Sequence, residues 1–182
     1  MTIICALHEP GIGTWIGSDT ACSKDGLRRL DRGPKWTIVG SRAMGSAGSH
    51  LLANIIDEHS GELLNFDGTP FQLARKFRKL LTDYEFAPKE EGGEAPIYRS
   101  YVIYATADGV WHFTVDGGVY AIGGCKFCAD GSGEDFAYGA AHFSLANHGS
   151  GKGTIIAALQ AAIDLSDGCG GDPWLHLLPA QC

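Results

Sequence analysis

The order of strand-like and helix-like patterns along the chain is the feature that most constrains its fold. In the first 48 residues, short apolar runs are separated by turn residues such as Pro10-Gly11 and Gly40-Ser41. Such runs predict four antiparallel strands joined by tight turns, and they occupy residues 2–7, 14–20, 35–39 and 43–47. The polar segment at residues 23–34 predicts a loop with little regular structure.

Helical spacing of apolar residues begins after Ser49, a candidate N-cap, and returns after Thr69-Pro70. We expect helices at residues 50–64 and from residue 69 onward, and a surface loop at the charged insert of residues 87–96. Strand-like runs follow, then two helical segments and a last strand. These lie at residues 98–106, 110–115 and 119–122, at 136–146 and 154–165, and at 174–178.

Groups of strands thus alternate with pairs of helices, which argues against a parallel doubly wound sheet. We therefore expect an α+β fold, a four-layer α-β-β-α sandwich with two antiparallel sheets between helical layers. The 182 residues suit one domain with a sizeable core, so we expect a single domain over residues 1–182.

The composition of the chain argues against some classes of function. Lys plus Arg is 14 and Asp plus Glu is 21, so the net charge is −7, and an acidic chain without a basic block is a poor nucleic-acid binder. No apolar run approaches the ~18 residues of a membrane span, and no basic region followed by a long apolar stretch opens the chain. We expect no membrane association, a cytoplasmic location, and free thiols at the six cysteines.

Thr2 is the first candidate functional residue. An N-terminal threonine carries its own base, because an α-amine with a pKa of ~7.7–8.0 can accept the proton of its hydroxyl. Methionine aminopeptidases act before small residues, so removal of Met1 would expose Thr2. Taken alone, a threonine after methionine is also simply a common second residue, and that alternative stays open at this point.

Further motifs follow Thr2 in a fixed order, and their combination is much more specific than any one of them. They are Gly17-Ser18-Asp19-Thr20, Lys35, Ala47-Gly48, Gly131-Ser132-Gly133 and Ala137-Tyr138-Gly139. On these motifs the sequence resembles, along nearly its whole length, the proteasome β-type family of N-terminal-nucleophile hydrolases. That family includes the HslV-type bacterial peptidases, and a bacterial branch first noted in betaproteobacteria looks more similar still. The resemblance implies the Ntn-hydrolase fold.

The resemblance also implies roles for the matching residues. Thr2 would be the nucleophile and its α-amine the base, with Lys35 stabilising the alkoxide and Asp19 orienting Lys35. The Gly48 N–H would donate into an oxyanion hole, and Ser132 would help to move the proton of the amine. The alternatives are a turn or strand-end carboxylate for Asp19, a surface lysine for Lys35 and a helix N-cap for Ser132.

One stretch departs from the family pattern. Where the family has Asp-x-x-Ser-Gly-Gly, this chain has Ser166-Asp167-Gly168-Cys169-Gly170-Gly171, so the acid is shifted by one position. Asp167 is retained as a catalytic candidate. By resemblance to HslV-type subunits, backbone carbonyls here are candidate ligands for a structural monovalent or divalent cation, at Ser166, Cys169 and Asp172. No cofactor is required. The expected substrate-binding residues are Cys22, Ser23, Ser46, Ala47 and Ser49.

Two other patterns carry little weight. Cys125 and Cys128 form a single C-x-x-C pair without the further ligands that structural zinc needs, so we interpret them as ordinary thiols in a loop. The segment Gly149-Ser150-Gly151-Lys152-Gly153-Thr154 lacks the spacing of a phosphate-binding loop.

The function expected from the resemblance is a threonine-type endopeptidase subunit of a self-compartmentalised double ring. Its partners would be identical subunits in stacked rings, an unfolded polypeptide or peptide substrate, and an ATPase unfoldase. Two alternatives remain: a catalytically silent ring-forming scaffold of the same fold, and a small-molecule Ntn amidase.

Overall fold

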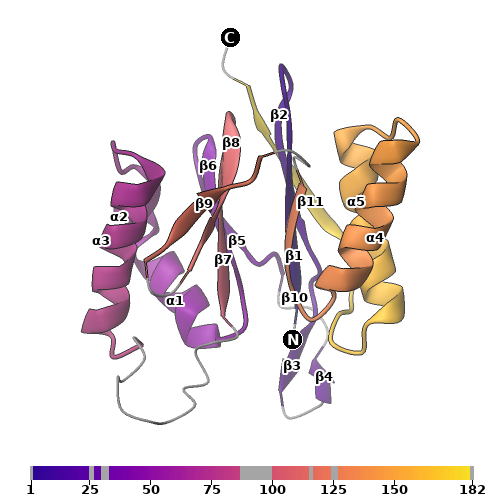
Figure 1. Cartoon of the computed structure of the whole chain (residues 1–182). Coiled ribbons are helices and arrows are strands. Elements are labelled where there is room, and N and C mark those ends of the chain that lie inside the picture. Colours follow the sequence, from indigo (N-terminus) through magenta and orange to yellow (C-terminus); the bar gives the residue numbers. More distant parts are fainter. Residues whose placement is uncertain are drawn as a thin grey trace.

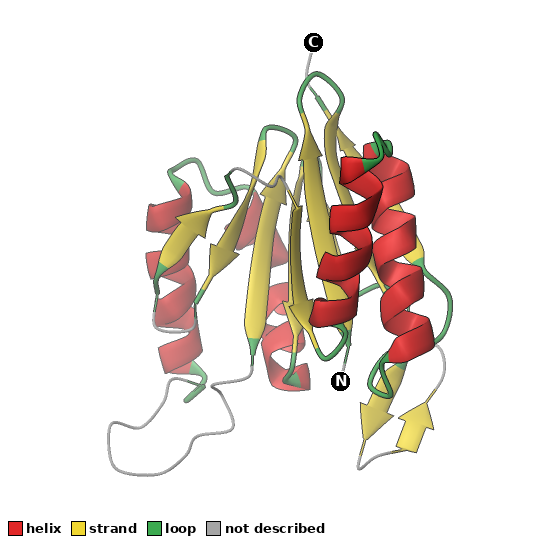
Figure 2. Ribbon diagram, turned by 45° about the vertical axis from the view of Figure 1, so that its right-hand side comes forward, coloured by secondary structure: helices red, strands yellow, loops and turns green. Residues whose placement is uncertain are grey.

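The chain forms four layers in a computed structural model, which describes residues 2–24, 27–29, 33–86, 100–114, 117–123 and 127–180. Two antiparallel sheets face each other, and helices cover the outer face of each (Figures 1 and 2). Helices α1, α2 and α3 cover one sheet, and α4 and α5 cover the other (Figure 1). The expected α-β-β-α sandwich is confirmed.

The first sheet has the strand order β10-β1-β2-β11, with every neighbouring pair antiparallel. Its strands are β1 (Ile3–Glu9), β2 (Gly13–Ser18), β10 (Phe127–Gly131) and β11 (Trp174–Pro179). Residue Ile3 pairs with Gly131, so the start of β1 lies beside the end of β10. This register brings Thr2 next to the Gly131-Ser132-Gly133 motif.

The second sheet has the order β5-β6-β7-β8-β9 and is also antiparallel. Its strands are β5 (Trp36–Val39), β6 (Arg42–Ala47), β7 (Tyr101–Thr106), β8 (Gly109–Phe113) and β9 (Val119–Ala121). The two hairpins expected in the first 48 residues therefore exist, but they belong to different sheets.

The helices begin at sequence-encoded caps. Ser49 Oγ accepts from the Leu51 N–H, and Thr69 forms a capping box with Gln72 before Pro70. The helices are α1 (His50–Glu58), α2 (Ser60–Leu64), α3 (Pro70–Asp83), α4 (Glu134–Ala146) and α5 (Gly151–Leu165). None of the helices in the described ranges is long and apolar enough to cross a membrane.

The apolar side chains form three clusters, one for each contact between adjacent layers. Ile4, Ile16 and Ile103 are fully buried between the two sheets. Phe77 and Phe113 pack in the cluster between the α1–α3 layer and its sheet, while Leu159 belongs to the cluster under α4 and α5. Burial on both faces explains why β1 reads as a continuous apolar run.

Three local expectations are wrong. Residues 23–34, expected as an irregular loop, contain an antiparallel hairpin of β3 (Cys22–Lys24) and β4 (Leu27–Arg29). The expected helix at residues 50–64 is divided at His59 into α1 and α2. Strand β10 was not expected, because Asp130 and a glycine in so short a run give a weak β signal.

Cys128 lies buried in β10, not in the loop that the C-x-x-C interpretation assumed, and forms no disulfide within the described residues. Cys125 and the insert at residues 87–96 lie outside the described residues.

Candidate active site

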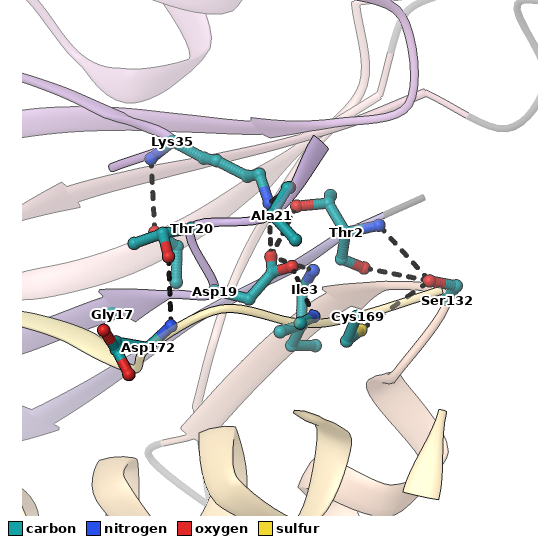
Figure 3. A network of polar contacts seen from close by, with 12 residues as sticks. Thr2, Ile3, Gly17, Asp19, Thr20, Ala21, Lys35, Ser132, Cys169 and Asp172 are labelled. Atoms are coloured by element: carbon teal, nitrogen blue, oxygen red, sulfur yellow. Dashed lines mark hydrogen bonds and ion pairs between the residues drawn. The ribbon is translucent and has the colours of Figure 1, made fainter. Parts of the chain in front are cut away.

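Thr2 lies at the start of β1, where its side chain is almost completely buried. Its hydroxyl donates a hydrogen bond of 2.7 Å from Oγ1 to Asp19 Oδ1 (Figure 3). Since β1 is a central strand held on both sides by β2 and β10, the position of Thr2 is fixed by backbone pairing. A threonine that follows the initiator methionine by chance would not be expected to have its hydroxyl bonded to a buried carboxylate.

Asp19 is the centre of the polar network and has no solvent-exposed surface. It follows directly after β2, and its two carboxylate oxygens accept from four donors. Oδ1 accepts from Thr2 Oγ1, from the Ile3 N–H at 3.0 Å and from Lys35 Nζ, while Oδ2 accepts from the Gly170 N–H at 3.1 Å. A buried carboxylate needs such donors, because an unpaired buried charge is very costly. Asp19 is therefore more than a turn carboxylate.

Lys35 lies just before β5 and supplies the positive charge of the site. Its side chain is 13% exposed, and Nζ forms an ion pair with Asp19 and also donates to the Ala21 carbonyl. The Lys35 backbone N–H donates to Ser18 Oγ at 3.2 Å, which ties the start of β5 to the end of β2. The lysine thus joins the two sheets across the site and is not a solvated surface side chain.

Ser132 contacts the backbone of Thr2 on the side opposite Asp19 (Figure 3). Its Oγ accepts from the Thr2 N–H at 3.2 Å and donates to the Thr2 carbonyl at 3.3 Å. The N-cap of α4 is Gly133 and has no side-chain hydrogen bond, so the alternative of Ser132 as N-cap is wrong. Ser132 is placed to contact an α-amine once Thr2 becomes N-terminal.

Ser166 and Cys169 belong to the same network in a way that the sequence did not reveal. Cys169 Sγ lies 3.7 Å from Ser132 Oγ, and Ser166 Oγ donates to the Ser132 carbonyl at 3.1 Å. Burial, with the nearby Asp19 charge, raises the pKa of the Cys169 thiol, so Cys169 stays protonated and can donate to Ser132. Both residues occupy the polar positions of the family's Asp-x-x-Ser motif, and that alignment was the signal that could have found them.

Asp167, the acid expected to support the site, is exposed at the turn that follows α5. Its neighbours Ser166 and Cys169 are buried, and these two residues make the contacts with Ser132. Its catalytic role stays a prediction.

A pocket of about 230 Å³ opens beside Thr2 and Lys35. Gly48, Ser46 and Ser49 contribute to its lining, whereas Ala47 is buried in β6 and does not. Gly48 adopts a φ of 108°, a backbone conformation that favours glycine, directly after the last residue of β6. The expected substrate-binding side chains of Cys22 and Ser23 lie outside what the structure describes.

The proposed cation ligands Ser166, Cys169 and Asp172 lie on the segment after α5. The Ser166 carbonyl accepts from the Cys169 N–H at 3.1 Å, and the Asp172 N–H donates to Thr20 Oγ1 at 3.1 Å. Carbonyl oxygens suit a hard cation, and the described residues contain no cluster of three His, Cys, Asp or Glu side chains that could hold a metal ion. The cation stays a prediction.

Gly131 offers a sharp test of how the site is held together. It has a φ of 118°, and a Cβ placed on it would lie 2.2 Å from the Thr2 carbonyl oxygen. We expect Gly131→Ala to lower the free energy of unfolding by about 1–3 kcal/mol, since the change adds both strain and a clash. The matched control is Gly139→Ala in α4, where a Cβ meets nothing within 4 Å, and where alanine should stabilise by about 0.5–1 kcal/mol. Urea unfolding measures both, and equal effects would contradict the tight packing of Gly131 on Thr2.

We compared the sequence and the structure with known proteins. No family model matches the sequence, and no curated protein matches it. Solved structures do match. BPH of Thiobacillus denitrificans in complex with epoxomicin has a TM-score of 0.75 at 19% identity, covering 97% of this chain and 99% of that chain. A second BPH structure gives 0.75 at 20% identity, covering 97% and 98%.

HslV from Trypanosoma brucei has a TM-score of 0.70 at 18% identity, covering 96% of this chain and 98% of that chain. The likeness extends over nearly the full length of each structure, so it includes both sheets and both helical layers. The chain therefore has the fold of the proteasome β-type and HslV-type proteins, as its sequence motifs indicated.

Proposed function

We propose that this chain is a threonine-type endopeptidase that uses Thr2 as its nucleophile after Met1 has been removed. The observation that carries the proposal is one continuous polar network in which the Thr2 hydroxyl, the buried Asp19 carboxylate and the Lys35 ammonium meet beside a pocket. A fold shared with HslV and BPH makes peptide-bond hydrolysis the natural reaction class, and this network supplies the groups that the reaction needs.

Removal of Met1 turns the Thr2 amide nitrogen into a free α-amine. In the proposed reaction this amine accepts the Oγ1 proton, directly or through one water, while Lys35 stabilises the developing alkoxide electrostatically. Oγ1 attacks the substrate carbonyl carbon and forms a tetrahedral adduct, whose oxyanion accepts from the Gly48 N–H. Collapse breaks the C–N bond, the leaving amine takes the proton, and water then hydrolyses the ester on Thr2.

Ser132 has a distinct part in this scheme. Its hydroxyl lies 3.2 Å from the Thr2 nitrogen and contacts the protonated Cys169 thiol on its other side. It can therefore orient the amine so that its lone pair faces Oγ1. Asp19 holds Lys35 in place and, through the Ile3 N–H, fixes the backbone beside the nucleophile.

The wider setting is also a proposal. Ring-forming relatives of this fold support identical subunits stacked in two rings, with Thr2 facing an interior chamber that unfolded polypeptides enter. An ATPase unfoldase would supply such substrates, and the cytoplasm would be the compartment. Size-exclusion chromatography with light scattering tests the assembly, since a stable monomer would contradict it.

The experiment that tests the proposed activity uses protein whose mature N-terminus has been confirmed as Thr2 by intact mass. We expect fluorogenic peptides to be cleaved, Thr2→Ala to lose cleavage, and Thr2→Ser to retain part of it because a hydroxyl and an α-amine remain. Retained peptidase activity in Thr2→Ala would refute the mechanism. Cleavage of small amides without peptide cleavage would favour the amidase alternative, and no cleavage by any form would favour the silent scaffold.

A further inference from the structure

The pocket beside Thr2 is lined by apolar side chains and by the carboxylate of Asp57, which forms no ion pair within the described residues. Thr37 of β5 and Met44 of β6 are paired across the two strands and both line it. Ala53, Ile56 and Asp57 line it from α1, where their spacing of three and four residues puts them on one face. Met44 and Ile56 are almost fully buried, so the core fixes this part of the lining.

Asp57 is the acidic group of this lining. Thr37 Oγ1 donates to Asp57 Oδ1, which orients the carboxylate toward β5. Within the described residues, no lysine, arginine or histidine forms an ion pair with Asp57. Its second carboxylate oxygen is therefore available to a donor that enters the pocket, and the exposed position lets Asp57 stay hydrated while the pocket is empty.

The other charged groups of the pocket do not neutralise the negative charge of the Asp57 carboxylate. The Lys35 ammonium is engaged by Asp19 on the Thr2 side, so the two charges offset each other. His50 also lines the pocket and is the remaining titratable group among the described lining residues. Among the described residues that line the pocket, Asp57 is the acidic side chain.

The spacing of residues at β5 indicates how long a substrate side chain has to be to reach Asp57. Lys35 and Thr37 are two residues apart, and the strand repeat separates them by roughly 6.7 Å. Asp57 is hydrogen-bonded to Thr37, at the far end of this step, so a substrate side chain that enters beside Thr2 and Lys35 has to be long to reach the Asp57 carboxylate. Lysine and arginine have this form, because a long aliphatic stem ends in a cation.

We propose that Asp57 is a specificity-determining residue and that the site prefers substrates with lysine or arginine immediately before the cleaved bond. This inference deepens the proposed peptidase function and rests on it for the position of the bond. The guanidinium or ammonium pairs with Asp57, and the stem lies along the pocket beside Ala53. A glutamate at the same substrate position is disfavoured by repulsion from the same carboxylate.

Hydrolysis tests the preference with peptides that differ in one residue. The pair is arginine and its uncharged analogue citrulline before the cleaved bond, compared by kcat/KM at pH 8. We expect arginine to exceed citrulline by about fivefold, the size of a partly solvated ion pair, and Asp57→Asn to bring the ratio close to one. The control is Glu58→Gln, which removes a neighbouring charge that does not line the pocket and should keep the ratio.

A binding measurement separates this inference from the peptidase proposal. N-acetyl-arginine amide and N-acetyl-citrulline amide are titrated into Thr2→Ala protein, followed by NMR, with and without Asp57→Asn. Tighter binding of the arginine compound that is lost in Asp57→Asn supports the inference even if no peptide is ever cleaved. Equal binding of the two compounds, together with equal cleavage of the two peptides, overturns it and leaves the peptidase proposal standing.

Discussion

Lys35→Met is expected to lower kcat/KM for peptide hydrolysis by about 10²–10³-fold, because it removes the cation that stabilises the Thr2 alkoxide. It should also lower the free energy of unfolding by about 3–5 kcal/mol, since Asp19 is left as a fully buried carboxylate without its ion-pair partner. A peptide hydrolysis assay measures the change in kcat/KM, and urea unfolding measures the change in stability, both on the same preparation.

The control is the double variant Lys35→Met with Asp19→Asn. It removes both charges and keeps a side-chain carbonyl that can accept from Thr2 and the Ile3 N–H. We expect it to recover much of the stability but none of the activity, because the cost of an unpaired buried charge is gone while the cation is still missing. Near-native hydrolysis by Lys35→Met would contradict the electrostatic role given to Lys35.

A blocked N-terminus is expected to lower the proposed peptidase activity sharply. One bulky residue inserted between Met1 and Thr2 prevents methionine removal, so the Thr2 nitrogen stays a peptide amide that cannot act as a base. The loss of a general base predicts a fall in kcat of about 10²–10⁴-fold. Intact mass confirms the retained extension, and the same peptide assay measures the loss.

The matched form carries an extension that a site-specific protease removes to leave Thr2 at the N-terminus. Activity should appear in proportion to the fraction cleaved, because the two forms differ only in the α-amine. Full activity before cleavage would rule out the amine as the base. A Ser132→Ala variant in the cleaved form should show a smaller loss, since Ser132 orients the amine but does not replace it.

The fold was predictable because local patterns of apolar residues, turn residues and helix caps indicate most of its strands and helices. The alternating apolar runs of the first 48 residues and the caps at Ser49 and Thr69 indicate strands and helices directly. Sequence alone could not say that the first two hairpins lie in different sheets, since long-range pairing decides that. Strand β10 was missed because its pairing with β1, rather than its own composition, makes it a strand.

The candidate site was likewise predictable only in part from the sequence. Asp19, Lys35 and Ser132 were found because they belong to motifs linked in order, and the structure brings all three to Thr2. From the sequence, Ser166 and Cys169 were expected only as cation ligands, because their contacts with Ser132 depend on how the segment after α5 folds back onto the site. Asp57 could not be found at all, since its place in the pocket depends on how α1 packs against β5 and β6.

The central claim is that the Thr2 hydroxyl is the reacting group, and covalent labelling tests it most directly. BPH of the same fold was solved with epoxomicin, so a peptide epoxyketone is a suitable probe. After reaction, intact mass followed by peptide mapping should show one adduct per chain on Thr2 of the Met1-free protein, and none in Thr2→Ala. An adduct that persists in Thr2→Ala, or its absence from protein with a proven Thr2 N-terminus, would contradict the account.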